Sequence, residues 1–157
     1  MRGVMVGLVA VAMLTGCKQS PSGKEPVTQA EAMRIVSEAE ATFTTGDLGK
    51  IMDQYADDAV MIDASKPDPS ADRKVATDSA RTFVSMKPAD YQVVARHIQL
   101  LGPDAFVSSG IERFSVAAGT ARPTVSARFT DVFQRNGNRW KIVHEHVSMP
   151  PTPAGKQ

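Results

Sequence analysis

Asp63 and Asp131 are carboxylates in otherwise apolar stretches of the chain, a pattern that suits acids that transfer protons. Asp63 follows the apolar run 59–62, and Asp131 shares one face of a predicted strand with Phe129 and Phe133. Burial disfavours the charged form of a carboxyl group and raises its pKa toward the range useful for proton transfer. We predict both as catalytic residues of a pocket lined by Phe129, one as base and one as neutral donor. The alternative is a solvated acid at Asp63 and a backbone cap or arginine partner at Asp131.

His144 and His146 stand at alternate positions of the last predicted strand, so their side chains project to the same side. Trp140 and Ile142 belong to the same alternating set, and their apolar character predicts that this face lines the pocket. Histidine is a common zinc ligand, but two ligands do not make a site, and no third follows at matching spacing. We therefore predict no metal and no cofactor, with Trp140, His144 and His146 as pocket residues.

Arg128 lies on the opposite strand face from Asp131 by simple alternation. Two roles are open for it: an ion pair with an acid of a neighbouring strand such as Glu112, or a contact with an anionic ligand in the pocket. A surface ion pair of this kind contributes less than about 1 kcal/mol.

These residues belong mainly to a predicted hairpin over residues 126–148. Asn136-Gly137 is a strong signal for a two-residue type I′ turn, because both residues tolerate positive φ. The segments 91–101 and 106–116 are expected to form two more strands of the same sheet, separated by turns rich in glycine and proline.

Three helices are predicted before the strands. Thr28 and Glu31 have capping-box spacing ahead of the apolar positions Ala32, Met33, Val36, Ala39 and Phe43. Asp47 can cap a short second helix whose apolar positions run to Tyr55, and residues 72–86 form the third. Helices followed by antiparallel strands predict an α+β fold with the helices packed on one face of the sheet.

The N-terminus contains an apolar run, residues 4–13, that is too short to span a bilayer and suits a secretory signal. It ends in Leu14-Thr15-Gly16-Cys17, which resembles a bacterial lipobox. That resemblance implies cleavage after residue 16 and lipidation of Cys17, the only cysteine. Lys18, in place of aspartate, resembles lipoproteins sorted to the outer membrane, so we expect a lipid-anchored protein of the bacterial cell envelope facing the periplasm.

The charge of the chain bears on which partners it can bind. The 157 residues include 18 basic and 17 acidic residues, and the basic residues form no stripe in the sequence. We therefore predict that the protein does not bind nucleic acid. We divide the chain into a signal peptide (1–16), a lipidated and flexible tether (17–27), one domain (28–149) and a disordered tail (150–157).

The domain carries a family resemblance in a few short segments. They are Gly46-Asp47, Tyr55-Ala-Asp-Asp-Ala59, Asp63 and Trp140-Lys-Ile-Val-His-Glu-His-Val-Ser148. In this order they resemble the SnoaL-like group of the nuclear transport factor two and ketosteroid isomerase superfamily, over residues 28–150. The resemblance implies a cone: a strongly curved, mostly antiparallel sheet around the helices, with a pocket between them, in a protein that forms homodimers.

The resemblance also implies roles for single residues. In ketosteroid isomerases, the position of Asp63 holds the general base, that of Asp131 a protonated acid, and that of Tyr55 a supporting tyrosine of the pocket. Ala39 stands where those enzymes have a second oxyanion donor, a tyrosine, so steroid isomerisation is not expected. The ending 139–148 also resembles the association domain of the calcium/calmodulin-dependent kinase, which would turn Val143, Glu145 and Val147 toward the pocket instead of the histidines.

Three function classes follow. The first, which we favour, is a tethered domain that binds a small apolar or amphipathic molecule. The second is a cofactor-free isomerase, dehydratase or cyclase that uses Asp63 and Asp131. The third is an assembly module whose sheet pairs two copies.

Overall fold

The computed structural model describes residues 25–150. The predicted signal peptide, Cys17, most of the tether and the tail from residue 151 lie outside these residues. No helix within 25–150 is long and apolar enough to cross a membrane.

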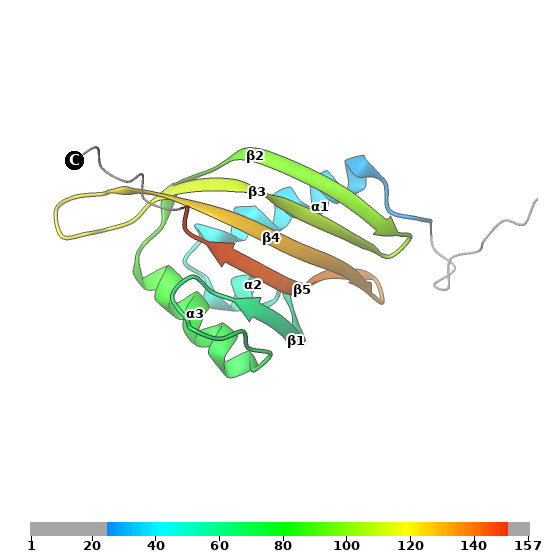
Figure 1. Ribbon diagram of the computed structural model, residues 1–157, viewed down its shortest axis with the longest axis horizontal. Coiled ribbons are helices and arrows are strands. Elements are labelled where there is room, and N and C mark those ends of the chain that lie inside the picture. The colour runs from blue at the N-terminus through cyan, green and yellow to red at the C-terminus, as the bar shows by residue number, and fades with distance from the viewer. Residues whose placement is uncertain (1–24, 151–157) are drawn as a thin grey trace, which may run out of the picture.

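Residues 25–150 have an α+β fold, as predicted, with three helices and a five-stranded sheet (Figure 1). The elements follow the order α1 (Gln29–Phe43), α2 (Leu48–Met52), β1 (Tyr55–Ile62), α3 (Arg73–Ser85), β2 (Ala89–Gly102), β3 (Ala105–Ser115), β4 (Thr124–Asn136) and β5 (Arg139–Ser148). The strand order across the curved sheet is β1-β5-β4-β3-β2. All neighbouring strands are antiparallel except β1 and β5, which are parallel.

Each helix begins after a capping side chain, and those of α1 and α2 are the predicted caps. The side chain of Thr28 accepts a hydrogen bond from the amide of Glu31, and Asp47 and Asp72 accept from amides in the first turns of α2 and α3. Such bonds satisfy amide groups that have no partner within the helix.

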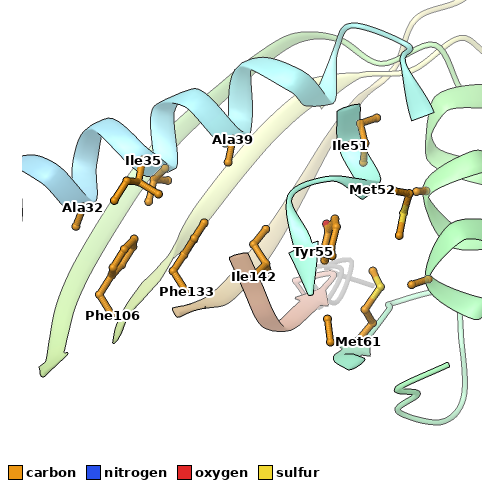
Figure 2. Close-up of a cluster of buried hydrophobic side chains, with 14 of the residues drawn as sticks. Ala32, Ile35, Ala39, Ile51, Met52, Tyr55, Met61, Phe106, Phe133 and Ile142 are labelled. Carbon is orange, nitrogen blue, oxygen red and sulfur yellow. The ribbon is translucent and has the colours of Figure 1, made fainter. Parts of the chain in front are cut away.

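The core lies between α1 and the middle strands. Figure 2 shows Ala32, Ile35 and Ala39 of α1 facing Phe106, Phe133 and Ile142 of the sheet. The rings of Phe106 and Phe133 stack with centroids 4.8 Å apart. This packing positions the sheet so that its inner face points toward the helices.

Several boundaries differ from the predictions. Val27, assigned to the tether, is buried in the core, and its amide donates to the carbonyl of Pro103. Met33, predicted to face the core, is 44% exposed, whereas Ile35 takes the inward position. Tyr55 begins β1 rather than ending the second helix.

The hairpin between β4 and β5 forms, but its turn is shifted by one residue. Asn136 pairs with Arg139, so Gly137 and Asn138 are the two central residues. Gly137 has φ of 60°, while Asn138 does not have a positive φ. Glycine at the first central position is the arrangement of a type II′ turn, not of the predicted type I′.

β5 contains an irregularity that decides which residues face the helices. Ile142 pairs with Phe133, but His144 pairs with Val132, so Val143 is an extra residue in the ladder. A bulge of one residue reverses the alternation of side chains beyond it. Trp140 and Ile142 therefore face inward before the bulge, and Glu145 and Val147 face inward after it.

Candidate functional site

A cavity of about 340 Å³ lies between the inner face of the sheet, the end of α1 and α3. Its wall is largely apolar and is made by four phenylalanines and three methionines: Phe43, Phe83, Phe114, Phe129, Met61, Met86 and Met149. The rings of Phe43 and Phe83, and of Phe83 and Phe114, meet edge to face at 6.4 and 5.4 Å. An apolar cavity of this size with a few polar groups is the usual form of a small-molecule site.

Asp131 and Glu145 lie side by side in this cavity. They are direct partners across β4 and β5, and both line the cavity wall. Asp131 is only 8% exposed, and its Oδ1 accepts no hydrogen bond from the described residues. Burial raises the pKa of Asp131 well above its usual range, and the neighbouring charges of Glu145 and Glu112 raise it further. These surroundings therefore favour the protonated form of Asp131 over the charged form.

Glu145 is held by a tyrosine. The hydroxyl of Tyr55 donates to Oε2 of Glu145 at 2.5 Å. Burial raises the pKa of Glu145 to about 7, although the hydrogen bond from Tyr55 lowers it. Tyr55, predicted as a pocket residue, thus lines the cavity and orients an acid whose ionisation changes near neutral pH.

The cavity is lined by a second tyrosine–glutamate pair. The hydroxyl of Tyr91 in β2 donates to Oε2 of Glu112 in β3 at 2.7 Å, and both residues line the cavity. Burial raises the pKa of Glu112, against the lowering effect of this bond.

Asp63 lines the same cavity from the loop after β1. Burial raises its pKa, but hydrogen bonds from the amide and hydroxyl of Ser65 and from Ser79 outweigh burial, so the pKa lies below its ordinary value. The two acids predicted as a pair do share one cavity, and their surroundings shift their pKa values in opposite directions.

Four predicted pocket residues do not line this cavity. Trp140 packs in the core against Phe106, with ring centroids 5.2 Å apart, and under the guanidinium of Arg135 at 4.7 Å. His144 and His146 point to the outer side of the sheet because the bulge at Val143 reverses the alternation.

Arg128 also lies on the outer side, where it and His146 line a separate surface depression. Its Nη2 donates to the carbonyl of Met149 at 3.2 Å. The suggested ion pair with Glu112 does not form, because Glu112 projects inward to Tyr91 while Arg128 projects outward.

The sequence prediction missed Glu112 and Tyr91 as cavity residues, and it placed Glu145 in the pocket only in the alternative drawn from the kinase association domain. Glu145 stands between Val143 and Val147 in an alternating row, and Glu112 stands between Gly110 and Phe114. Both patterns would mark an acid on an apolar face, but only a known register identifies that face as the inner one.

Arg96 and Glu40 form a partly buried ion pair and do not line the cavity. Arg96 Nη2 lies 2.5 Å from Glu40 Oε1, with side chains 13% and 16% exposed, and joins β2 to α1. The Arg96 guanidinium also lies 6.0 Å from the centroid of Phe129. The positive charge nearest Asp131 is thus committed to another acid, although it still lowers the pKa of Asp131.

No group of three or more histidine, cysteine, aspartate or glutamate residues within 25–150 could hold a metal ion. The carboxyl groups that line the cavity can supply hydrogen bonds, negative charge and proton transfer.

Solved structures with this architecture are numerous, and three relatives illustrate their range. A protein from Xanthomonas campestris assigned as a calcium/calmodulin-dependent protein kinase II association domain is 25% identical, with a TM-score of 0.72, covering 80% of this chain and 90% of the other. The CaMKII hub homology domain of Chlamydomonas reinhardtii is 18% identical, with a TM-score of 0.64 and coverage of 78% and 98%.

The third relative, from Streptomyces avermitilis, is assigned as a dehydratase of the NTF2-like family. It is 14% identical, with a TM-score of 0.66 and coverage of 76% and 97%. No curated protein matches the chain. The sequence profile of the SnoaL-like domain matches residues 33–152, which is most of the chain and includes the whole cavity-bearing sheet. The chain therefore belongs to the SnoaL-like domain family.

Proposed function

We propose that this protein binds a small apolar or amphipathic molecule in the cavity between α3 and the sheet. The observation that carries the proposal is a cavity lined by aromatic rings and methionines together with carboxyl groups. Burying apolar ligand surface against such a wall is favourable by about 25 cal/mol per Å².

The test uses the soluble domain from Lys18 onward, purified without added ligand and examined by native mass spectrometry. A copurifying small molecule is expected. It should be lost in Met86→Trp, because the indole ring is bulkier than the methionine side chain that lines the cavity. Met33→Trp is the matched control, because Met33 is exposed on α1 and does not line the cavity. A molecule retained equally by both variants would show that it binds elsewhere.

We also propose that the domain is anchored in the bacterial cell envelope through lipid on Cys17, facing the periplasm from the outer membrane. The support is the lipobox-like sequence ending at Cys17 and the lysine that follows it. Each buried methylene of an acyl chain contributes about 0.8 kcal/mol to membrane binding. Cys17→Ser should move the protein from the membrane fraction to the soluble fraction, and unchanged sedimentation with membranes would contradict the anchor.

A second candidate function is cofactor-free acid–base catalysis. Asp63 and Asp131 line one cavity, and the lowered pKa of Asp63 and the raised pKa of Asp131 favour the states required of a base and a neutral donor. One structural relative is assigned as a dehydratase. Turnover of a panel of enones and hydroxy-ketones should fall at least about 100-fold in Asp63→Asn. It should be unchanged in Asp68→Asn, in the exposed part of the same loop.

A homodimer paired through the outer face of the sheet is the third proposal. Two structural relatives are described as an association domain and a hub domain. Such a dimer is compatible with ligand binding, because the cavity opens on the other side of the sheet.

A further inference from the structure

The hydroxyl groups around the cavity leave few hydrogen-bond donors for a ligand. The described cavity wall contains five side-chain hydroxyls: Tyr55, Ser65, Ser79, Thr82 and Tyr91. The two tyrosines donate to glutamates, the two serines donate to Asp63, and Thr82 donates to a main-chain carbonyl of α3. Every one of these hydroxyl protons is therefore already used within the protein.

The acceptors of the wall are in excess by comparison. Four carboxyl groups face the cavity: Asp63, Glu112, Asp131 and Glu145. Asp131 is more than nine-tenths buried, and its Oδ1 has no partner within residues 25–150. No lysine, arginine or histidine of the described chain lines the cavity. A buried acceptor without a donor costs free energy that an incoming donor can recover.

We propose that the natural ligand is an organic amine bound in its protonated form, with N–H groups directed at the carboxyl groups and an apolar body against the aromatic wall. This inference rests on the proposed binding function and specifies the chemical class of the ligand. A carboxylate ligand would meet like charge without a compensating cation. A ketone could accept a hydrogen bond only from a carboxyl group that keeps its proton, because the side-chain hydroxyls of the wall are already engaged.

The aromatic wall supports the same ligand class. Phe43, Phe83 and Phe114 meet in edge-to-face contacts beside Glu112, so apolar rings and carboxyl oxygens face the same space. A cation within about 6 Å of a ring face is attracted by the ring quadrupole, and this attraction grows when water is excluded. Charge and apolar contact thus favour one amphipathic cation.

Ligand binding should be linked to proton release. The groups facing Asp131 and Glu145 are Tyr55, Glu112, Glu40 and Arg96, with Asp63 also acting on Glu145. Because burial and like charges hold protons on these acids, a bound ammonium group favours their ionised forms and releases protons. The neutral analogue of the same ligand should release none.

The experiment uses four naphthalene probes that differ only in their polar end. They are naphthylethylamine, propylnaphthalene, naphthylacetone and naphthylacetate, titrated by calorimetry near neutral pH in two buffers of different ionisation enthalpy. The amine should bind at least about tenfold more tightly than propylnaphthalene, with proton release. Asp131→Asn should remove most of that advantage and leave propylnaphthalene binding within about twofold, because the substitution keeps the shape of the side chain.

One control variant and one second cavity variant keep the result interpretable. Asp58→Asn removes one carboxylate from an exposed position of β1 and should leave all four affinities unchanged. Glu145→Gln is a second cavity variant that retains an acceptor for Tyr55, so it serves if Asp131→Asn does not fold. Equal or tighter binding of the neutral, ketone or carboxylate probe would overturn the amine inference while leaving the binding function intact. Absence of binding by all four probes would overturn both.

Discussion

At the scale of single residues, the protonation of Glu145 is the property with the clearest consequence for stability. Its pKa rises from an ordinary value of 4.5 to about 7, chiefly because it is buried. Between these values, the folded state holds a proton that the unfolded state has lost. Stability therefore falls as pH rises through this window and levels off above it, with a slope of up to about 1.4 kcal/mol per pH unit.

Glu145→Gln should reduce this slope between pH values of about 5 and 7, because glutamine does not titrate and still accepts from Tyr55. Some slope will remain, since the pKa values of Asp131, Glu112 and Glu40 are raised as well. Urea unfolding at several pH values measures it, with Glu38→Gln on the exposed face of α1 as control. Identical slopes in wild type and Glu145→Gln would disprove the assignment.

At the scale of elements, Gly110 allows β2 and β3 to approach each other at an irregular point of their ladder. A Cβ atom at residue 110 would lie 2.0 Å from the carbonyl oxygen of Ala95, where the register shifts. Backbone atoms cannot move aside as the end of a flexible side chain can.

Gly110→Ala should therefore lower the free energy of unfolding by about 3 kcal/mol or more. Gly119→Ala is the control: that residue has φ of 61° but open space around the added atom, so only the backbone cost of about 1 kcal/mol is expected. Chemical denaturation of both variants measures the difference, and equal losses would refute the steric explanation.

The ion pair of Arg96 and Glu40 connects β2 to α1. Arg96→Met leaves the Glu40 carboxylate buried without its partner and should cost about 3 kcal/mol. The double variant Glu40→Leu with Arg96→Met should recover much of that loss, because it removes both charges. In the exposed pair of Arg34 and Glu38, Arg34→Met should cost less than about 1 kcal/mol. Thermal and urea unfolding compare the four proteins.

At the scale of the whole molecule, the proposed homodimer depends on the outer face of the sheet. Ile111 is 38% exposed and projects outward, since its neighbour Glu112 lines the cavity on the inner side. Ile111→Arg should convert a dimer to a monomer in sedimentation velocity at micromolar concentration. Met33→Arg, on the exposed side of α1, should leave the dimer intact. A wild-type protein that sediments as a monomer would contradict the proposal.

Much of the fold followed from local sequence because local interactions decide it. Thr28, Asp47 and Asp72 are caps that each satisfy amides within a few residues, so the helix starts were predictable. The alternation of residues along β4 correctly predicted that Phe129 and Asp131 face inward, because β4 has no irregularity in its pairing with β3. Asp63, which follows β1, was correctly placed in the same cavity as Asp131.

The rest of the site depends on pairing between strands that are distant in the sequence. The bulge at Val143 lies in a strand that pairs with both β4 and β1, and one extra residue exchanges the two faces of the strand beyond it. The sequence of β5 alone is compatible with either face, so it could not place His146 outside and Glu145 inside. Likewise, Tyr91 and Glu112 meet only after β2 and β3 pair. Local sequence determined the helices, the strands and two of the acids, and the tertiary register decided which further acids surround them.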